Sequence, residues 1–424
     1  MRVLIYSFGT QGDVQPYIAL AKGLIRAGHE AALCTAEGFR ADIEAHGVTY
    51  AYMNNDMLRL IQDAMPNMSG PRDTYKIIRA MRPAMRSALD DQWTAAQRLQ
   101  PSVIVYHPKA LGGYHIAEKL GVPSAISLPL PFFTPTREFP IPFIGSWPLG
   151  PSANRLSYQF QRFTAVAYGG MLNDFRRTAL RLPSIRRTDD LLHDHDGRPL
   201  TVLYPFSRHV RPVPADYPPQ AHVTGYWFLD HLDDWQPTAE LERFLDAGEA
   251  PVYIGFGSMG FDKGAGDRRR AIVAAVEREG IRAILATGWS RPIEDQHAEN
   301  IFVLDAAPHD WLFPRVAAVV HHGGAGTTGA GLRAGRPTLI CPVLGDQPFW
   351  GTQVHRLGAG PKPLPWRRIT AERLSDRVRS LLTSEQYRYN ADHIGRGIRS
   401  EDGIASAISV LEALHENQHQ RSRS

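Results

Sequence analysis

The chain has 424 residues, a formal net charge of +4 at neutral pH and a sequence pI of about 9.0. Hydrophobic residues make up 43% of it and charged residues 21%, which are the proportions of a folded globular protein. The length exceeds what one hydrophobic core usually supports, so two domains are predicted. Basic and acidic residues are interleaved, which argues against nucleic acid as a partner.

Cysteine content and hydropathy indicate a cytoplasmic protein. Cys34 and Cys341 each lie in an apolar run typical of a buried strand, so no disulfide is predicted. Residues 1–7 are too short for a signal peptide, and no run of about 18 apolar residues occurs. Basic residues cluster at 176–181 and at 186–187. The favoured interpretation is a solvated helix face, and the alternative is peripheral contact with an anionic membrane.

The N-terminal half alternates strands and helices, which predicts a parallel, doubly wound sheet. An apolar run over residues 3–7, a glycine loop and the apolar spacing of residues 16–27 predict a strand, a turn and a helix. The expected elements that follow are a strand at 30–34, a helix at 38–46, a strand at 48–52, a helix at 75–98 and a strand at 103–106.

Asp13 lies in the first strand-to-helix loop, within Gly12-Asp-Val-Gln-Pro. One interpretation is a helix cap, since Asp is common at that position. The other is a general base at the tip of the first strand, because an alcohol that attacks a sugar carbon must lose a proton. Spacing alone does not decide between the two.

Residues 128–150 are rich in proline and phenylalanine and predict an irregular, aromatic-lined loop. Such a loop either walls an apolar acceptor pocket or serves as a rigid connector that covers the core. Both interpretations stay open.

A second alternating series follows a polar stretch at residues 230–240. It predicts two doubly wound domains joined near residues 205–240, with a cleft between them where the carboxyl ends of both sheets meet. The expected strands are at 252–256, 283–287, 301–304, 316–321 and 338–341. The expected helices are at 268–279, from the glycine loop to residue 334, and after residue 346.

The loop His321-His-Gly-Gly-Ala-Gly-Thr-Thr follows one of these strands and opens a helix. Backbone N–H groups and the helix dipole make such a loop suitable for a diphosphate. Hydroxyl groups of Thr327 and Thr328 and a ring N–H of His322 add hydrogen-bond donors. The loop lacks the Lys-Ser/Thr ending of a Walker motif and the spacing of the dinucleotide fingerprint.

Two further motifs of the second half accompany this loop. Ser258, in Gly255-Phe-Gly-Ser-Met-Gly, is placed to reach the same phosphates. Asp346 and Gln347 suit the vicinal hydroxyls of a hexose, although the local sequence alone favours a helix N-cap as the explanation of Asp346. The segment Asp194-His-Asp resembles a metal-binding Asp-x-Asp element, but no strand or glycine loop precedes it, so no metal site is predicted.

Taken together, the motifs resemble those of sterol 3-β-glucosyltransferases, within the family that includes plant small-molecule and antibiotic aglycone glycosyltransferases. The resemblance spans most of the chain. It is carried by Gly9-Thr-Gln-Gly-Asp-Val-Gln-Pro-Tyr, Phe139-Pro-Ile-Pro-Phe, Val223-Thr-Gly-Tyr-Trp, Tyr253-Ile-Gly-Phe-Gly-Ser-Met, Gly288-Trp-Ser, Pro308-His-Asp-Trp-Leu-Phe-Pro, the loop at 321–328, Gly345-Asp-Gln-Pro-Phe-Trp and Ser400-Glu-Asp-Gly-Ile.

The resemblance implies a GT-B fold and an inverting, metal-independent transfer of glucose from UDP-glucose, which needs no cofactor. Residues 1–205 would bind the acceptor, 206–240 link the domains, 241–395 bind the nucleotide sugar, and 396–416 form a helix that returns to the N-terminal domain. Asp13 matches the base and Asp346 and Gln347 match sugar contacts. The positions that match the diphosphate contacts of the family are Ser258, His322, Gly324, Gly326 and Thr327. Thr328, the next residue, is expected to join them.

Two features leave the substrates open. Ala306 stands where plant relatives have a uracil-stacking Trp, so a TDP-sugar is an alternative to UDP-glucose. The expected acceptor is a sterol, a hopanoid or a polyketide-like alcohol.

A carboxylate is a weak base near its ordinary pKa, so either burial raises the pKa of Asp13 or proton transfer is coupled to attack. A sugar-nucleotide epimerase and a non-catalytic auxiliary partner are the remaining alternatives, and the oligomeric state is not predicted.

Overall fold

The computed structural model describes residues 1–56, 59–60, 71–142, 149–186, 192–194, 197–230, 235–257, 265–286 and 299–421. The chain forms two compact units. The N-terminal domain comprises Met1–Phe206, Val213–Leu229 and Asp402–Ser424, and the C-terminal domain comprises Ser207–Pro212 and Asp230–Glu401. Neither domain is therefore a single continuous stretch of chain.

A seven-stranded parallel sheet in the order β3-β2-β1-β4-β5-β6-β7 forms the centre of the N-terminal domain. Its middle strands are short apolar runs buried on both faces, as expected when helices cover both sides. The strands are β1 (Arg2–Tyr6), β2 (Glu30–Ala36), β3 (Thr49–Met53), β4 (Val103–Tyr106), β5 (Ser124–Ser127), β6 (Thr201–Tyr204) and β7 (Ala221–Val223).

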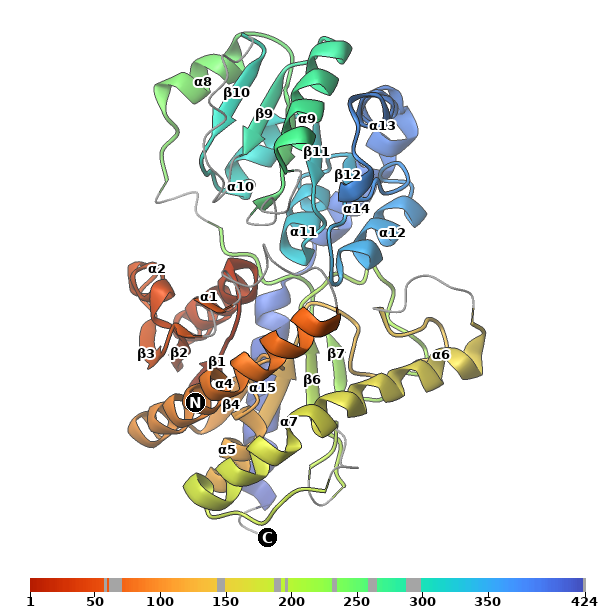
Figure 1. The fold of residues 1–424 in the computed structure, drawn as a ribbon. Helices are drawn as coiled ribbons and strands as arrows, with labels where there is room; N and C mark the ends of the chain where they lie inside the picture. Colours follow the sequence, from red (N-terminus) through yellow and green to blue (C-terminus); the bar gives the residue numbers. More distant parts are fainter. Residues whose placement is uncertain are drawn as a thin grey trace. The chain divides into compact units, whose positions relative to one another are not determined.

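Helices precede and follow these strands along the chain (Figure 1), and those nearest the two ends of the chain bury apolar side chains in one core with the sheet. The helices of this domain are α1 (Gln11–Arg26), α2 (Arg40–Ala45), α4 (Pro71–Leu99), α5 (Gly113–Leu120), α6 (Pro151–Ser157), α7 (Arg162–Phe175) and α15 (Gly403–Arg421), with short helical turns at η1 (Glu37–Phe39), η4 (Tyr158–Gln161) and η5 (Arg176–Leu180).

The C-terminal helix α15 is part of the N-terminal domain, where Figure 1 shows it in blue among that domain's elements. It packs on α1 and places Ala407, Ile408 and Leu411 in the same core as the β1 side chains Val3 and Ile5. The indole N–H of Trp227 donates to the carbonyl oxygen of Gly403 at 3.1 Å and fixes the start of the helix.

Replacing Leu411 with alanine is expected to destabilise the N-terminal domain by about 2–5 kcal/mol, because its side chain is 0% exposed and the surrounding core cannot fill the cavity. Urea unfolding followed by intrinsic fluorescence measures the effect. Leu156→Ala is the control, since that side chain is 68% exposed and its loss leaves no cavity. Equal midpoints for the two variants would show that α15 is not part of the core.

The C-terminal domain contains a five-stranded parallel sheet in the order β10-β9-β8-β11-β12. The strands are β8 (Val252–Gly255), β9 (Ala283–Ala286), β10 (Ile301–Leu304), β11 (Ala318–His321) and β12 (Thr338–Ile340). The helices are α8 (Ala239–Asp246), α9 (Ala265–Glu279), α10 (His309–Leu312), α11 (Ala325–Arg333), α12 (Gln347–Arg356), α13 (Ala371–Thr383) and α14 (Glu385–Arg399), with η7 (Phe313–Arg315) and η8 (Trp366–Arg368).

Two parallel α/β domains confirm the predicted fold class, with more strands than the sequence indicated. β5, β6 and β7 were not predicted. β5 (Ser-Ala-Ile-Ser) and β7 (Ala-His-Val) have no sustained apolar run, whereas β6 (Thr-Val-Leu-Tyr) is a short apolar run like β4 and was overlooked. The other strands lie within a few residues of their expected positions.

The described part of the proline- and phenylalanine-rich segment has no helix or strand of its own over residues 128–141. Phe139 and Ile141 are buried and form a small cluster with Tyr158. These side chains pack within the domain, which favours the connector interpretation for them. Residues 143–148, which the interpretation as an acceptor wall included, lie outside the described part.

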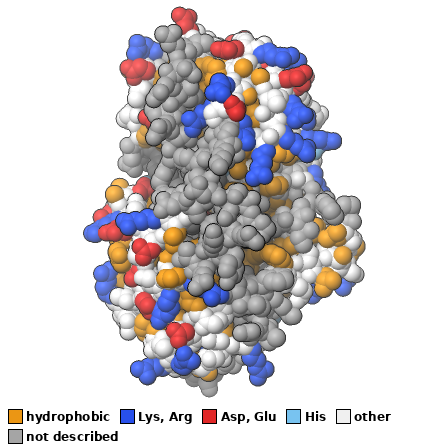
Figure 2. All heavy atoms as spheres, viewed as in Figure 1, with side chains coloured by type: hydrophobic (Ala, Val, Ile, Leu, Met, Phe, Trp, Pro, Cys, Tyr) orange, Lys and Arg blue, Asp and Glu red, His pale blue; other side chains and the backbone are white. Residues whose placement is uncertain are grey.

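The basic spot at residues 176–181 is not a continuous surface patch. Arg176 is 1% exposed and its guanidinium binds Glu118, with Nη1–Oε2 at 2.6 Å and Nη2–Oε1 at 2.9 Å. Basic, acidic and hydrophobic side chains are interspersed on the visible face of the N-terminal domain (Figure 2). Within the described residues, no helix combines the length and apolar character that crossing a bilayer requires.

Candidate active site

Asp13 lies in the first turn of α1, after the loop that follows β1. Thr10 is the N-cap residue, and its backbone N–H donates to Oδ2 of Asp13 at 2.8 Å, as in a capping box. Gly9 permits this contact, because its φ is +143° and a Cβ there would lie 2.0 Å from Oδ2. Asp13 therefore does cap the helix, and capping does not prevent its carboxylate from serving as a base.

Two side chains from the loop after β4 contact the same carboxylate. Nζ of Lys109 lies 2.9 Å from Oδ1 and 3.0 Å from Oδ2. Nε2 of His107 lies 3.5 Å from Oδ1; the His107 side chain is 1% exposed and that of Asp13 is 20% exposed. β1 and β4 are neighbours in the sheet, so the loops after them meet at one edge.

His107 and Lys109 were not predicted from the sequence. The signal for them was their position directly after the predicted strand at 103–106, since carboxyl ends of parallel strands share one edge of the sheet. Without knowledge that this strand pairs with the first one, nothing singled out these two residues.

Neighbouring charges decide the protonation states of this cluster. Burial acts to raise the pKa of Asp13, but the Lys109 and His107 charges and the hydrogen bonds from Lys109 and Thr10 outweigh it and lower that pKa. Burial, assisted by the Lys109 charge, lowers the pKa of His107 to about 3. At neutral pH the carboxylate is ionised and the imidazole is neutral. Burial therefore does not raise the pKa of Asp13 in this state.

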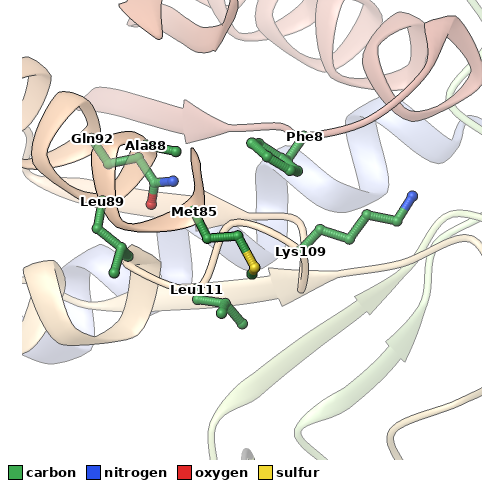
Figure 3. A pocket seen from close by; sticks show the side chains of 7 residues that line it. All are labelled: Phe8, Met85, Ala88, Leu89, Gln92, Lys109 and Leu111. Atoms are coloured by element: carbon green, nitrogen blue, oxygen red, sulfur yellow. The ribbon is translucent and has the colours of Figure 1, made fainter. Parts of the chain in front are cut away.

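An apolar pocket of the N-terminal domain lies beside Lys109 (Figure 3). Its cavity volume is about 10 Å³, which is room for about one water molecule and far below the size of a ligand pocket. The methylene chain of Lys109 lines the pocket, and its amino group points away from Met85 and Leu111. The lining residues are Phe8, Met85, Ala88, Leu89, Gln92, Lys109 and Leu111.

The glycine-rich loop of the C-terminal domain joins β11 to α11, as predicted. Gly323 has φ +100°, and a Cβ there would lie 2.6 Å from Cγ2 of Ile340. Gly324 is the N-cap of α11 and offers no side chain, so no N-cap side chain occupies the first backbone N–H groups of the helix. Gly326 is exposed in the first turn. Such a helix end is suited to an anion.

His322 lies at the start of this loop with its Nδ1 buried and, among the described residues, without a hydrogen-bond partner. Burial lowers the pKa of His322 to about 4, so the neutral ring offers one N–H donor at pH 7. A Cβ on Gly257, at the end of β8, would lie 3.5 Å from Cε1 of His322. The loops after β8 and β11 therefore meet at this ring.

The two threonines of the loop differ in their surroundings. Thr327 is partly exposed at the start of α11. Thr328 is buried, and its hydroxyl donates to the Gly324 carbonyl oxygen at 2.9 Å. Thr328 therefore holds the loop together, which leaves its predicted contact with a phosphate without structural support.

Asp346 and Gln347 lie at the start of α12. Asp346 occupies the N-cap position without a capping hydrogen bond, and its Oδ2 instead accepts the indole N–H of Trp350 at 2.9 Å. Gln347 is 3% exposed, and its Oε1 accepts the backbone N–H groups of Val343 at 2.7 Å and Leu344 at 3.1 Å. The amide NH₂ of Gln347 is the part of that side chain left for a ligand.

Four of the positions singled out in the sequence remain to be placed. Ser258 and the Gly288-Trp-Ser motif lie outside the described residues. Ala306, where plant relatives carry a stacking Trp, is exposed. The Asp194 carboxylate accepts the backbone N–H of Arg198 at 2.7 Å and so stabilises a turn. Within the described part of the chain, no group of three or more His, Cys, Asp or Glu side chains is arranged to hold a metal ion.

Acid is expected to destabilise the protein through buried histidines whose pKa is lowered in the folded state. Burial lowers the pKa of His107 and His115 to about 3 and of His309 and His322 to about 4. Their unfolded pKa is about 6.5, so below that pH the unfolded chain binds protons that the folded protein does not. Stability is therefore complete above about pH 6.5 and falls toward pH 4, by up to about 1.4 kcal/mol per pH unit for each histidine.

Thermal unfolding between pH 7.5 and pH 5 measures this effect. The unfolding temperature should fall steadily below pH 6.5, and His115→Gln should fall less steeply because one neutral histidine is removed. A constant unfolding temperature over this range would contradict the neutral, buried state of these rings.

Comparison with known families matches a segment in each half of the chain. Residues 3–139 match the glycosyltransferase family 28 N-terminal domain. Residues 271–414 match the C-terminal domain of erythromycin biosynthesis protein CIII-like proteins.

Solved structures with the same fold include the glycotransferase of kitacinnamycin, with a TM-score of 0.72 and 16% identity over 97% of this chain and 98% of that one. Glycosyltransferase VinC, solved in complex with dTDP, has a TM-score of 0.70 and 19% identity over 98% of this chain and 100% of that one. The likeness establishes a GT-B fold.

Curated relatives of much higher identity include two sterol 3-beta-glucosyltransferases of Arabidopsis thaliana, each 35% identical over 97% of this chain, which spans 65% and 68% of their lengths. A sterol 3-beta-glucosyltransferase of Aspergillus terreus is 35% identical over 97% of this chain, which spans 30% of its length. The chain belongs to the sterol 3-beta-glucosyltransferase family.

Proposed function

We propose that this protein transfers glucose from UDP-glucose to the hydroxyl group of a sterol or a similar apolar alcohol, with inversion, to give a β-glycoside. Family membership supports glycosyl transfer. The single observation that carries the acceptor class is the 35% identity to sterol 3-beta-glucosyltransferases over 97% of this chain. In the N-terminal domain, Phe8 and Met85 line a small pocket with Lys109, whose amino group binds the Asp13 carboxylate. An apolar acceptor that bound against these side chains would bring its hydroxyl near that carboxylate.

In the proposed reaction the acceptor oxygen attacks the anomeric carbon while its proton passes to Asp13. The bond between the anomeric carbon and the diphosphate oxygen breaks, and UDP leaves with the electron pair. The low pKa of Asp13 makes it a weak base before attack, so proton transfer would accompany bond formation, when the acceptor hydroxyl becomes acidic.

The start of α11 would hold the leaving diphosphate. Its backbone N–H groups, the neutral ring of His322 and the partly exposed Thr327 supply donors, and the helix dipole favours negative charge. The Asp346 carboxylate, which Trp350 holds in place, would accept a hydrogen bond from a sugar hydroxyl. The donors at α11 would stabilise the negative charge that develops on UDP as the bond breaks.

Incubating the protein with UDP-glucose and TDP-glucose against sterols, hopanoids and macrolide or phenolic aglycones tests the proposal. Products are scored by mass, and the anomeric proton coupling in NMR reports inversion. Adding a chelator tests the expectation that no metal takes part. Release of glucose to water alone, or epimerised nucleotide sugar with no glycoside from any acceptor, would contradict the proposal.

A further inference from the structure

His107 is held rigidly beside Asp13. Its backbone N–H donates to the Tyr6 carbonyl oxygen at 2.8 Å, and its carbonyl oxygen accepts from Ala110 at 2.8 Å. The Tyr17 ring and the imidazole form a T-shaped pair with 6.2 Å between their centroids. Tyr17 is fixed in turn, because its hydroxyl donates to the Ser127 carbonyl oxygen at 2.8 Å. The imidazole has little freedom to turn.

The tautomer of His107 follows from its contacts. The backbone N–H of Lys109 donates to Nδ1 at 3.1 Å, so Nδ1 carries a lone pair. The ring is neutral because burial lowers its pKa to about 3, and the proton of a neutral imidazole is then on Nε2. His107 therefore presents an Nε2–H toward Asp13.

This Nε2 atom is buried and has no hydrogen-bond partner within the part of the chain that the structure describes. It lies 3.5 Å from Oδ1 of Asp13, just beyond the usual hydrogen-bond range. A movement of a few tenths of an ångström completes the bond, and such bonds often tighten when substrate binds.

Asp13 has fixed and replaceable partners. The Thr10 N–H holds Oδ2 from the backbone, and the buried His107 faces Oδ1. Lys109 bridges both oxygens, but its side chain is 52% exposed and is the easiest of the three to displace. An acceptor hydroxyl would take the place of the ammonium group.

We propose that His107 is a positioning residue, whose Nε2–H holds Oδ1 of Asp13 so that the carboxylate faces the acceptor hydroxyl when Lys109 moves away. The acceptor proton goes to Asp13 and not to His107, because Nε2 already carries a proton and Nδ1 accepts from Lys109. The inference rests on the proposed role of Asp13 as the base.

A matched pair of amide variants tests the inference. In His107→Gln the side-chain NH₂ reaches the former Nε2 position, whereas in His107→Asn the amide reaches only the Nδ1 position and offers Asp13 no donor. The pKa of Asp13 is measured by carboxyl ¹³C NMR in the substrate-free protein. Transfer is measured as kcat and KM over a range of pH, with thermal unfolding to confirm folding.

Without the donor, the ionised carboxylate is less stabilised. In His107→Asn the pKa of Asp13 should rise, the acid limb of kcat/KM should move to higher pH, and kcat should fall by roughly tenfold with little change in the KM for UDP-glucose. His107→Gln should restore both the pKa and most of kcat. The other groups facing Asp13 are Lys109, Thr10 and Tyr17, and all three are unchanged in both variants.

An unchanged pKa of Asp13 in folded His107→Asn would overturn the inference. So would equal loss in both variants, which would mean that His107 acts only through packing. If the wild-type protein transferred no sugar, the proposed function would fail, and the NMR titration would still decide whether His107 holds Asp13.

Discussion

Replacing Asp13 with asparagine should reduce kcat/KM for glycosyl transfer by about 10²- to 10⁴-fold, the usual contribution of a general base. The amide has nearly the shape of the carboxylate but cannot accept the acceptor proton. Transfer to the sterol or other acceptor found active is measured by mass. Full activity in Asp13→Asn would contradict the assignment of the base.

Two controls separate catalysis from folding. The asparagine oxygen can still accept the Thr10 N–H that now bonds Oδ2 at 2.8 Å, but the amide NH₂ takes the place of the oxygen that faces Lys109 and His107, so Asp13→Asn should stay folded with a moderately lower unfolding temperature. Asp13→Ala loses the cap as well, and should lose about 0.5–2 kcal/mol of stability. Binding of UDP, measured by calorimetry, should be unchanged in both variants because the candidate diphosphate loop is in the other domain.

Adding one methyl group at Gly326 should weaken UDP binding by roughly tenfold or more without loss of stability. Nothing lies within 4 Å of a Cβ built there, so the fold accepts it. The methyl group would occupy space beside the first N–H groups of α11, where the diphosphate is proposed to bind, and the loss of one hydrogen bond to a charged group accounts for the size of the effect.

Gly266→Ala is the matched control for Gly326→Ala. It is an exposed glycine at the second position of α9, as Gly326 is at the second position of α11, and a Cβ there meets only Nη1 of Arg270 at 3.9 Å. Its affinity for UDP should not change. Equal affinities in all three proteins would remove the start of α11 as the diphosphate site.

Gly323→Ala, unlike Gly326→Ala, is expected to destabilise the fold. With φ at +100° and Ile340 Cγ2 only 2.6 Å from the added Cβ, it should lower stability by roughly 1–3 kcal/mol. Urea unfolding compared with Gly326→Ala tests whether the two glycines serve different purposes, one for the backbone turn and one for ligand access.

Strand-helix alternation was sufficient to predict both parallel sheets, because buried central strands such as β4 are unbroken apolar runs. The strands that escaped prediction lie toward one edge of the N-terminal sheet. β5 reads Ser-Ala-Ile-Ser and β7 reads Ala-His-Val, and pairing with a neighbour rather than local composition makes them strands.

The glycine loop at residues 321–328 was predictable because its local sequence carries its chemistry. The surroundings of Asp13 were not, since His107 and Lys109 are about 95 residues away in sequence and reach it only through the pairing of β1 and β4. Thr328 shows that a matching motif can also mislead. Its hydroxyl, predicted to contact a phosphate, is hydrogen-bonded inside the loop instead.

The return of α15 to the first domain constrains how the protein is made and how it can be divided. Core residue Leu411 and the Gly403 carbonyl that fixes Trp227 leave the ribosome well after the strands of the same domain. The first domain therefore cannot complete its core during synthesis until residues 402–421 have emerged, long after residues 1–206. A chimera that exchanges acceptor domains between relatives must accordingly transplant two separate stretches of the gene, because a single crossover near residue 230 would combine α15 of one parent with α1 of the other.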